Sequence, residues 1–288
     1  MRHDFDFVKP ASLREALDLI SEGNPATRPL AGGTDIIAGL QQNAPRFTGI
    51  QTLVDIHNLP ELKAIREAGN GISIGGAATF SEIRNHPLIR EKFPLLAKAA
   101  GTIGSVQIRN RATLAGNFVN NAPCADSVPP LLVYEAEIKI QSAHGERKIP
   151  LQDFLLKPYR TQLQPNELVT EILLPRPPAG YSGDFYKLGR RRGVAVSRIT
   201  LAVLAKVRNN LLEDIRISSG AVTPIGLRFP ELEALARGKP VLPDHLKEIA
   251  RKLGEQVLDK TGLRWSTPYK LPVTQQTFYG LLHRICIK

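Results

Sequence analysis

The residues from Thr102 to Asp126 (TIGSVQIRNRATLAGNFVNNAPCAD) are of types that could hold a ligand, and a folding core alone would not require them. The stretch combines Gly104, a polar run from Gln107 to Arg111, and the turn TLAGN at residues 113–117. Small residues let a backbone approach a ligand closely, and Thr and Asn side chains can hydrogen-bond to phosphate oxygens or cap a helix. Alone, the pattern fits a ligand-binding loop and an ordinary polar turn about equally well.

A second glycine-rich stretch, PLAGGTDI at residues 29–36, favours the ligand-binding interpretation. It follows a short apolar segment and precedes the residues IAGL at 37–40, which predicts a strand, a Gly-Gly turn and then a helix. Such a turn offers free backbone N–H groups to an anion. The spacing is not that of GxGxxG, and GxxxxGK[ST] occurs nowhere in the chain. Two loops of this kind, far apart in the sequence, could clasp one pyrophosphate.

These motifs resemble the two FAD-binding loops in the flavoprotein subunit of molybdenum hydroxylases, a family that includes xanthine dehydrogenase and carbon monoxide dehydrogenase. The residues that carry the resemblance are LAGGTD at 30–35, QIRN at 107–110, TLAGN at 113–117 and Ala125-Asp126. The resemblance extends along essentially the whole chain, including its C-terminal third. The AGGTD form and the segment LVDIHNL at 53–59 are most similar to bacterial xanthine dehydrogenase FAD subunits.

Carried over residue by residue, the resemblance implies two phosphate loops and several contacts to the flavin. The backbone N–H groups of the Gly32-Gly33 turn would be the main donors to the FAD pyrophosphate. Lys187 matches a basic residue beside the isoalloxazine, where a cation would stabilise an anionic reduced flavin. No residue is expected to be catalytic. The expected cofactor-binding residues are Pro29, Leu30, Ala31, Gly32, Gly33, Thr34, Asp35 and Ile36 in the first loop, Thr113, Gly116 and Asn117 in the second, Ile103 packed against the cofactor, Asp126 as an acidic contact, Val169 as an apolar contact on the adenine side or the ring, and Lys187.

Three of these features have simpler interpretations. Asp126 could be the N-cap of a helix that begins near Val128, because Asp is a common cap. Lys187 taken alone would be a solvated side chain, and the triplet at residues 190–192 (RRR) would be a solvated run of charge. The triplet could also form the lip of the site and meet an anionic electron acceptor such as a dinucleotide. Gly193-Val194 stands where some family members carry an acidic residue, which leaves NAD open as the acceptor.

Composition excludes several classes of protein. In this chain of 288 residues, 42% are hydrophobic, but no stretch approaches the roughly 18 apolar residues of a membrane span. The N-terminus has no apolar signal core, and the only cysteines are Cys124 and Cys286, which suggests a reducing, cytoplasmic setting. The net charge of +11 raises nucleic acid as a partner, but the basic residues are spread along the chain without a nucleic-acid-binding motif. A basic surface that faces an acidic partner subunit explains the charge equally well.

Metal chemistry in this chain is not expected. The six histidines form no HxxxH motif or Cys/His cluster, so neither a zinc site nor an iron–sulfur cluster is supported. Cys124 is interpreted as a small residue close to the flavin loop rather than as a nucleophile, because no histidine lies beside it in the sequence to activate it.

Several elements that would position these loops can be predicted. Ser12–Glu15 and Thr79–Glu82 read as capping boxes, the first opening a helix that ends near residues 23–25 and the second a helix that stops before Pro87. Apolar stripes at helical spacing predict two C-terminal helices. The residues of the two stripes are Leu246, Ile249, Leu253 and Val257, then Phe278, Leu281, Leu282 and Ile285. A further short helix is expected at 93–100. The expected strands are 28–31, 52–56, 71–76, 168–174, 201–207 and 214–218, with a hairpin of 134–141 and 147–150.

The predicted fold is α+β. A two-subdomain FAD-binding domain of the vanillyl-alcohol-oxidase (PCMH) type is expected at residues 1–176, with subdomains at about 1–58 and 59–176, followed by a domain of sheet plus helices at 177–288. FAD would be held non-covalently between them. The resemblance further implies a large partner subunit with a molybdopterin centre and a small partner with [2Fe–2S] clusters, whose electrons reach the flavin and then NAD or another acceptor. A self-contained flavin-dependent oxidoreductase with its own small substrate is the alternative, and a basic binding module without FAD is a third possibility.

Overall fold

Three short parallel strands form the N-terminal part of the structure, a computed structural model that describes residues 5–191 and 193–287. The strands are β1 (Asp6–Val8), β2 (Thr27–Leu30) and β3 (Thr52–Asp55), in the order β1-β3-β2. Parallel strands need crossover connections, and α1 (Leu13–Leu19) lies in the connection from β1 to β2, which flank β3. The chain then passes through α2 (Ile36–Gln41) and the 3₁₀ turn η1 (Pro45–Phe47) to reach β3. The loop after β2 is thus held at the edge of a small sheet.

The middle of the chain forms an antiparallel sheet of five strands in the order β4-β5-β10-β6-β7. Its central strand, β10, is the last of the five in the sequence and follows the helices of this part of the chain. The strands are β4 (Ile65–Ala68), β5 (Gly71–Gly75), β6 (Glu137–Ser142), β7 (Gly145–Pro150) and β10 (Leu168–Pro175). The helices are α3 (Phe80–Asn85), α4 (Pro87–Lys92), α5 (Pro94–Thr102), α6 (Val106–Arg109), α7 (Leu114–Asn120), α8 (Val128–Val133) and α9 (Leu151–Phe154), with η2 (Pro60–Leu62) and the small hairpin of β8 (Leu155–Lys157) and β9 (Arg160–Thr161).

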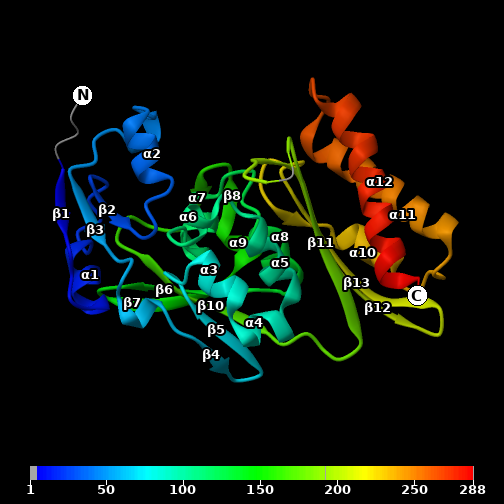
Figure 1. Cartoon of the computed structure of the whole chain (residues 1–288), viewed down its shortest axis with the longest axis horizontal. Coiled ribbons are helices and arrows are strands. Elements are labelled where there is room, and N and C mark those ends of the chain that lie inside the picture. Colours follow the sequence, from blue (N-terminus) through cyan, green and yellow to red (C-terminus); the bar gives the residue numbers. More distant parts are fainter. Residues whose placement is uncertain (1–4, 192, 288) are drawn as a thin grey trace.

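The C-terminal part is an antiparallel meander covered by helices on both faces (Figure 1). Side chains alternate along β12: Ala202 and Leu204 pack with the core of the middle part, whereas Leu201 and Val203 pack with the C-terminal helices. The middle sheet and the meander therefore share one continuous core through α5 and α8. The elements are β11 (Tyr181–Gly189), β12 (Ser197–Arg208), β13 (Leu211–Gly220), β14 (Leu227–Arg228), α10 (Pro230–Ala236), α11 (Pro243–Thr261) and α12 (Thr267–Cys286).

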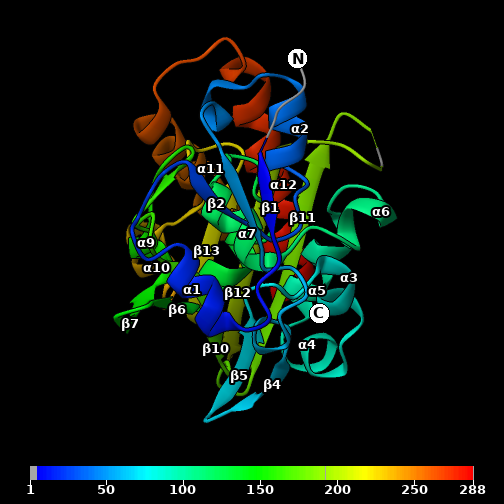
Figure 2. The ribbon, with the colours of Figure 1, turned by 90° about the vertical axis from the view of Figure 1, so that its left-hand side faces the viewer.

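Seen from its N-terminal side, the molecule presents the small parallel sheet in front of the middle sheet and the meander (Figure 2). In Figure 1, α2 stands at the upper left, α6 and α7 lie in the centre, and the tip of β11 lies to their right.

The predicted elements are present, with several differences in their ends and caps and with some additional elements. Thr79 and Glu82 form a complete capping box, but at α1 only the Ser12 half forms, because Glu15 accepts from the N–H of Ala11 instead. Helix α1 ends at Leu19, earlier than predicted, and two successive turns carry the chain to Gly23. A further helix, α4, begins at Pro87, which is well placed at the first helical position. β12 begins at Ser197, earlier than the predicted strand, and β1 and β4 are additional short strands.

One feature predicted as a turn is a helix. Residues 113–117 form the N-cap and first turn of α7, and the Thr113 hydroxyl accepts from the N–H of Gly116 at 3.2 Å. The glycine at position 116 favoured the prediction of a turn, because glycine lowers helix propensity. A Cβ at Gly116 would lie 2.8 Å from the Thr113 hydroxyl oxygen, so the glycine leaves room for the cap.

Candidate functional site

The first glycine-rich loop presents backbone N–H groups that the protein itself does not use. Leu30 ends β2 in a buried position, Gly33 adopts a left-handed conformation with φ of 73°, and α2 begins at Ile36. In the described part of the chain, the N–H groups from Gly32 to Asp35 donate to no protein oxygen, whereas the N–H of Ile37, in the first turn of α2, donates to the carbonyl of Gly33. Successive free N–H groups in a turn of mixed handedness form an anion-binding concavity.

The two loops meet at Gly32. A Cβ on Gly32 would lie 2.2 Å from the carbonyl oxygen of Arg111 and 2.8 Å from the Cα of Ala112. Backbone-to-backbone packing at this distance excludes every residue except glycine. The first loop is therefore seated directly on the residues that lead into α7, and a ligand that binds one loop is also next to the other.

The second loop is held in place by backbone contacts to the residues that follow β5. The N–H groups of Leu114 and Ala115 donate to the carbonyls of Ala78 and Gly76, and Thr113 forms an isolated bridge with Thr79. These contacts are backbone contacts, so they hold α7 in place whatever its exposed side chains do.

Asn117 connects α7 to the start of α8. Its Oδ1 accepts from the hydroxyl of Ser127 at 2.7 Å, and it lies half-buried. Because the oxygen is engaged, the amide nitrogen is the end of the side chain that remains to donate. An oriented NH₂ group at the first turn of a helix suits a phosphate oxygen.

Asp126 and Lys187 form a buried ion pair on the other side of α7. The Lys187 ammonium lies 2.6 Å from Asp126 Oδ2 and 2.9 Å from the Thr102 carbonyl, and the side chains are 10% and 6% exposed. The Ser197 hydroxyl donates to the other carboxylate oxygen. Asp126 is therefore not a helix cap: α8 begins at Val128 with Ser127 at the N-cap, and the carboxylate instead fixes β11 to the segment between α7 and α8.

Charges from both loops act on one small region. Burial raises the pKa of the Asp126 carboxyl, and the Lys187 ammonium opposes that shift. Burial, followed by the charge of Asp126, raises the pKa of the Cys124 thiol, and the carboxylate of Asp35 adds to the shift. The charges of Asp35, in the first loop, and of Asp126 thus act on the same thiol. A thiol with a raised pKa is a poor nucleophile.

The other predicted contacts lie around this region. Ile103 ends α5 and is buried, with its carbonyl accepting from Arg109 at 2.9 Å. Val169 is 6% exposed within the core, and its carbonyl approaches Gly76, below the start of α7. The remaining residues support or border the first loop: Pro29 lies in β2, Ala31 packs against the core near α1, Thr34 is half-buried beyond the Gly-Gly turn, and Ile36 packs against the cluster of Leu30, Leu40 and Leu53.

Sequence reasoning missed the side chains that hold the site in shape. Arg109 is buried, and its guanidinium donates to the carbonyls of Ile103 and Gly104, so it shapes the turn between α5 and α6. Arg46 lies 3.5 Å from the Asp35 carboxylate, donates to Asn120 of α7, and stacks on Tyr159. Only Arg109 had a signal, since it belongs to the QIRN motif.

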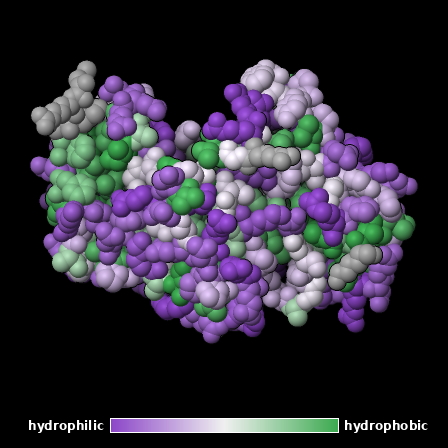
Figure 3. All heavy atoms as spheres, viewed as in Figure 1, coloured by the Kyte–Doolittle hydropathy of each residue, from purple (hydrophilic) through white to green (hydrophobic). Residues whose placement is uncertain are grey.

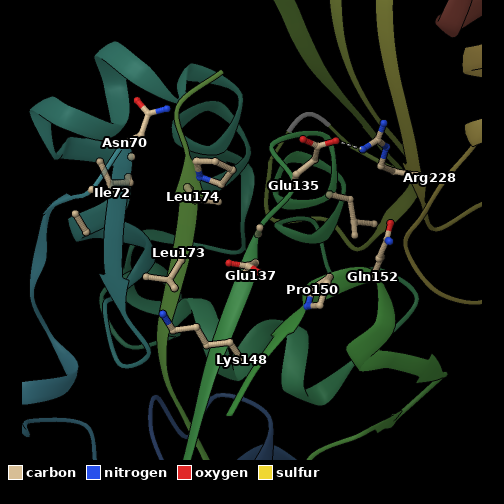
Figure 4. A pocket seen from close by; sticks show the side chains of 16 residues that line it. Asn70, Ile72, Glu135, Glu137, Lys148, Pro150, Gln152, Leu173, Leu174 and Arg228 are labelled. Carbon is tan, nitrogen blue, oxygen red and sulfur yellow. Dashed lines mark hydrogen bonds and ion pairs between the residues drawn. The ribbon is translucent and has the colours of Figure 1, made fainter. Parts of the chain in front are cut away.

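Figure 3 shows a depression along the upper edge, between the part that carries α2 and the part that carries α11 and α12. A cavity of about 770 Å³ lies elsewhere, beside β5, β10 and β6, and includes none of the predicted cofactor contacts. Its polar groups engage one another: Arg228 donates to Glu135 at 3.0 Å, as Figure 4 shows.

Comparison with known proteins identifies the family. The model described as the FAD binding domain in molybdopterin dehydrogenase matches residues 3–177, and that of the CO dehydrogenase flavoprotein C-terminal domain matches residues 184–285. The chain belongs to the family of FAD-binding subunits of molybdopterin-dependent dehydrogenases. The predicted family, the α+β fold with its C-terminal flavoprotein domain, FAD as the cofactor and the role as an oxidoreductase component are thereby confirmed.

Family relatives resemble this chain over nearly its full length. It is 34% identical over 273 residues to the glyceraldehyde dehydrogenase medium chain of Sulfolobus acidocaldarius, covering 94% of this chain and 95% of the relative. It is 32% identical over 276 residues to a xanthine dehydrogenase FAD-binding subunit of Escherichia coli, covering 94% and 93%. A structure of carbon monoxide dehydrogenase from Hydrogenophaga pseudoflava superposes with a TM-score of 0.91 at 27% identity, covering 99% and 98% of the two chains.

Two observations complete the description of this family member. Within residues 5–191 and 193–287, no helix is both long and apolar enough to cross a membrane. In the same residues, no group of three or more His, Cys, Asp or Glu side chains is arranged to hold a metal ion. The third arginine of the triplet, Arg192, lies outside the described residues.

Proposed function

We propose that this chain is the FAD-binding electron-transfer subunit of a xanthine-dehydrogenase-like molybdenum enzyme. In this proposal, a large partner subunit holds the molybdopterin centre, a small partner holds [2Fe–2S] clusters, and electrons leave through this chain to NAD or another acceptor. When bound, FAD supplies the electron-carrying group. The observation that carries the proposal is the seating of the two loops on each other at Gly32, next to the buried pair of Lys187 and Asp126.

The loops are suited to bind the pyrophosphate. The N–H groups from Gly32 to Asp35, which donate to no oxygen in the described residues, supply donors without a charged side chain, and the amide nitrogen of Asn117 would add a donor from α7. Thr113 and Gly116 set the first turn of α7 through the cap, and they contribute shape rather than charge. Arg46 holds Asp35 and Asn120, and so positions the first loop against α7.

Lys187 is suited to tune the flavin. Its ammonium is fixed by the Asp126 carboxylate and the Thr102 carbonyl, so it cannot swing into solvent. Held beside the isoalloxazine, this cation would favour the anionic reduced flavin and raise its reduction potential. Asp126 acts by orienting Lys187, and Ser197 orients Asp126. Ile103 and Val169 supply the apolar packing below the cofactor.

The same contacts argue against an enzyme with its own small substrate. General acid–base chemistry needs a titratable group that is free to reach the substrate. Asp126 and Lys187 are instead paired with each other and with Ser197 and Thr102. The thiol of Cys124, with its raised pKa, is also unsuited to form a covalent flavin bond, which supports non-covalent binding.

The domain boundaries and the location belong to the proposal as well. We assign residues 1–176 to the FAD-binding domain, with a division near 58/59, and residues 177–288 to the C-terminal domain, because each part has its own sheet. Both cysteines are free, which supports a cytoplasmic, reducing location.

The experiment is purification through an affinity tag on this chain, followed by identification of the partner subunits. We expect a molybdopterin subunit and a cysteine-rich iron–sulfur subunit to copurify, and the flavin absorption to bleach when NADH is added anaerobically if NAD is the acceptor. If both subunits copurify but the flavin is not reduced by NADH, the acceptor is a molecule other than NAD. A chain that carries flavin but copurifies with neither subunit would contradict the electron-transfer role.

A further inference from the structure

The connection between α11 and α12 exposes large apolar side chains to solvent. Leu263 is 85% exposed and Trp265, the single tryptophan of the chain, is 88% exposed. Tyr269, in the first turn of α12, is 48% exposed. Exposed single apolar residues are common, but a tryptophan and a leucine this exposed on one short connection are costly unless a partner covers them.

A second connection, between β11 and β12, extends this surface. Val196 is 73% exposed, and the guanidinium of Arg198, two residues later, lies 5.9 Å from the ring centre of Tyr269. Figure 1 shows both connections at the upper end of the C-terminal part, the end that α2 and α7 also face. We call residues 190–191, 193–198 and 259–270 the rim surface.

The rim surface carries a large share of the positive charge. Its described residues include six basic side chains and one acidic side chain, a net charge of +5, compared with +11 for the whole chain. Among the described residues, Arg198, Arg264 and Lys270 form no salt bridge, and the last two donate to the carbonyls of Thr261 and Ala221 instead. Lys270 is partly desolvated and is close to the other two cations, which together lower its pKa. Nothing within this part of the chain neutralises these charges.

The rim surface is also joined to the cofactor site by short connections. Lys270 donates to the carbonyl of Ala221 at 2.8 Å, and the N–H of Ala221 donates to the carbonyl of Pro123, three residues before Asp126. On the other side, β11 runs from Lys187 directly into residues 190–196, and Ser197, which holds Asp126, follows them. A protein that binds the rim surface would therefore lie next to the groups that hold the flavin.

We propose that the rim surface docks an acidic protein partner that exchanges electrons with the flavin. Only the electron-transfer part rests on the proposed function above. Trp, Tyr and Arg are the residues that dominate the binding energy of protein interfaces, and a positive surface steers an acidic partner toward it. A protein suits this surface better than a dinucleotide or nucleic acid, because Leu263 and Val196 are aliphatic side chains that gain from burial but not from stacking on bases.

The test compares three forms of the tagged full chain in its complex: the wild type, the double variant Arg264→Glu/Trp265→Ser, and Lys239→Glu as a control. Lys239 is exposed near the end of α10, away from the rim surface, and its replacement makes the same change of charge. We expect the acidic subunit that copurifies with the wild type to be lost from the double variant, with binding weakened about tenfold or more, and to be retained by the control. The FAD content should be the same in all three.

A photo-crosslinking residue, p-benzoylphenylalanine in place of Trp265, then locates the partner. A crosslink to an acidic segment of the copurified iron–sulfur subunit supports the docking site. A crosslink to a second copy of this chain or to nucleic acid, an undiminished partner in the double variant, or equal loss in the Lys239→Glu control overturns it. The absence of FAD from the wild type would refute the proposed function alone, because partner retention is measured separately.

Discussion

Replacing Gly32 with alanine tests whether the two loops act as one site. The new Cβ would lie 2.2 Å from the Arg111 carbonyl oxygen, whereas a carbon and an oxygen normally approach no closer than about 3.3 Å. Both neighbouring atoms belong to the backbone, so no side chain can rotate away. The loops must therefore separate by about 1 Å, and overpacking of this kind costs about 1–3 kcal/mol.

If that cost is borne mainly by the FAD-bound state, the dissociation constant for FAD should rise about fivefold to hundredfold. The assay is titration of the apoprotein with FAD, followed by the quenching of flavin fluorescence, with thermal unfolding measured in parallel. Gly145→Ala is the matched control, because nothing lies within 4 Å of its Cβ position. Gly32→Ala with unchanged FAD affinity would refute the contact between the loops as a determinant of binding.

Gly33 should respond differently from Gly32. A Cβ at Gly33 would meet only the side chains of Ile37 and Leu30, each at 3.4 Å, so close backbone approach is not what requires glycine there. Its φ of 73° is the requirement, and an alanine in the left-handed region costs about 1–2 kcal/mol of folding stability. Gly33→Ala should therefore lower the unfolding temperature without the specific loss of affinity expected of Gly32→Ala.

Three further predictions follow from charges and caps. Lys187→Met should lower the flavin reduction potential in an anaerobic titration. It should also destabilise the fold by about 3 kcal/mol, because the buried carboxylate of Asp126 is left unpaired. An unchanged potential would contradict the placement of Lys187 beside the isoalloxazine. Thr79→Ala should cost about 1 kcal/mol in urea unfolding and Ser12→Ala less, because only Thr79 has a complete capping box; equal losses would count against that reasoning. The hydrogen bonds from Arg147 lower the pKa of Glu167 from its ordinary value of 4.5. Glu167→Gln should therefore be less stable than the wild type by about 1 kcal/mol at pH 7, and this difference in stability should vanish as the pH falls through the lowered pKa. A stability difference that grows in acid would contradict this reasoning.

The sequence was sufficient for features that depend on local backbone chemistry. The Gly32-Gly33 turn, the strand before it and the helix after it follow from residue types within ten positions, and so does the complete capping box at Thr79. The two C-terminal helices also follow from the sequence, because their apolar residues recur at regular helical spacing. The alternation of such helices with predicted strands gave the α+β class.

Contacts between distant residues could not be predicted from pattern alone. The ion pair of Asp126 and Lys187 joins residues 61 positions apart, and Asp126 by itself could also have been a helix cap. Ser197 gave no signal, because a serine at the start of a strand has many ordinary roles. The approach of Gly32 to Arg111 likewise depends on how two sheets pack, which no local propensity encodes.

The central claim is that this chain binds FAD where the two loops and Lys187 meet. The most direct measurement is the visible absorption spectrum of the purified chain after incubation with FAD and desalting, for the wild type and for Gly32→Ala. We predict flavin bands at stoichiometric occupancy in the wild type and a marked loss in the variant. A colourless wild type, or full flavin occupancy in both proteins, would contradict the account.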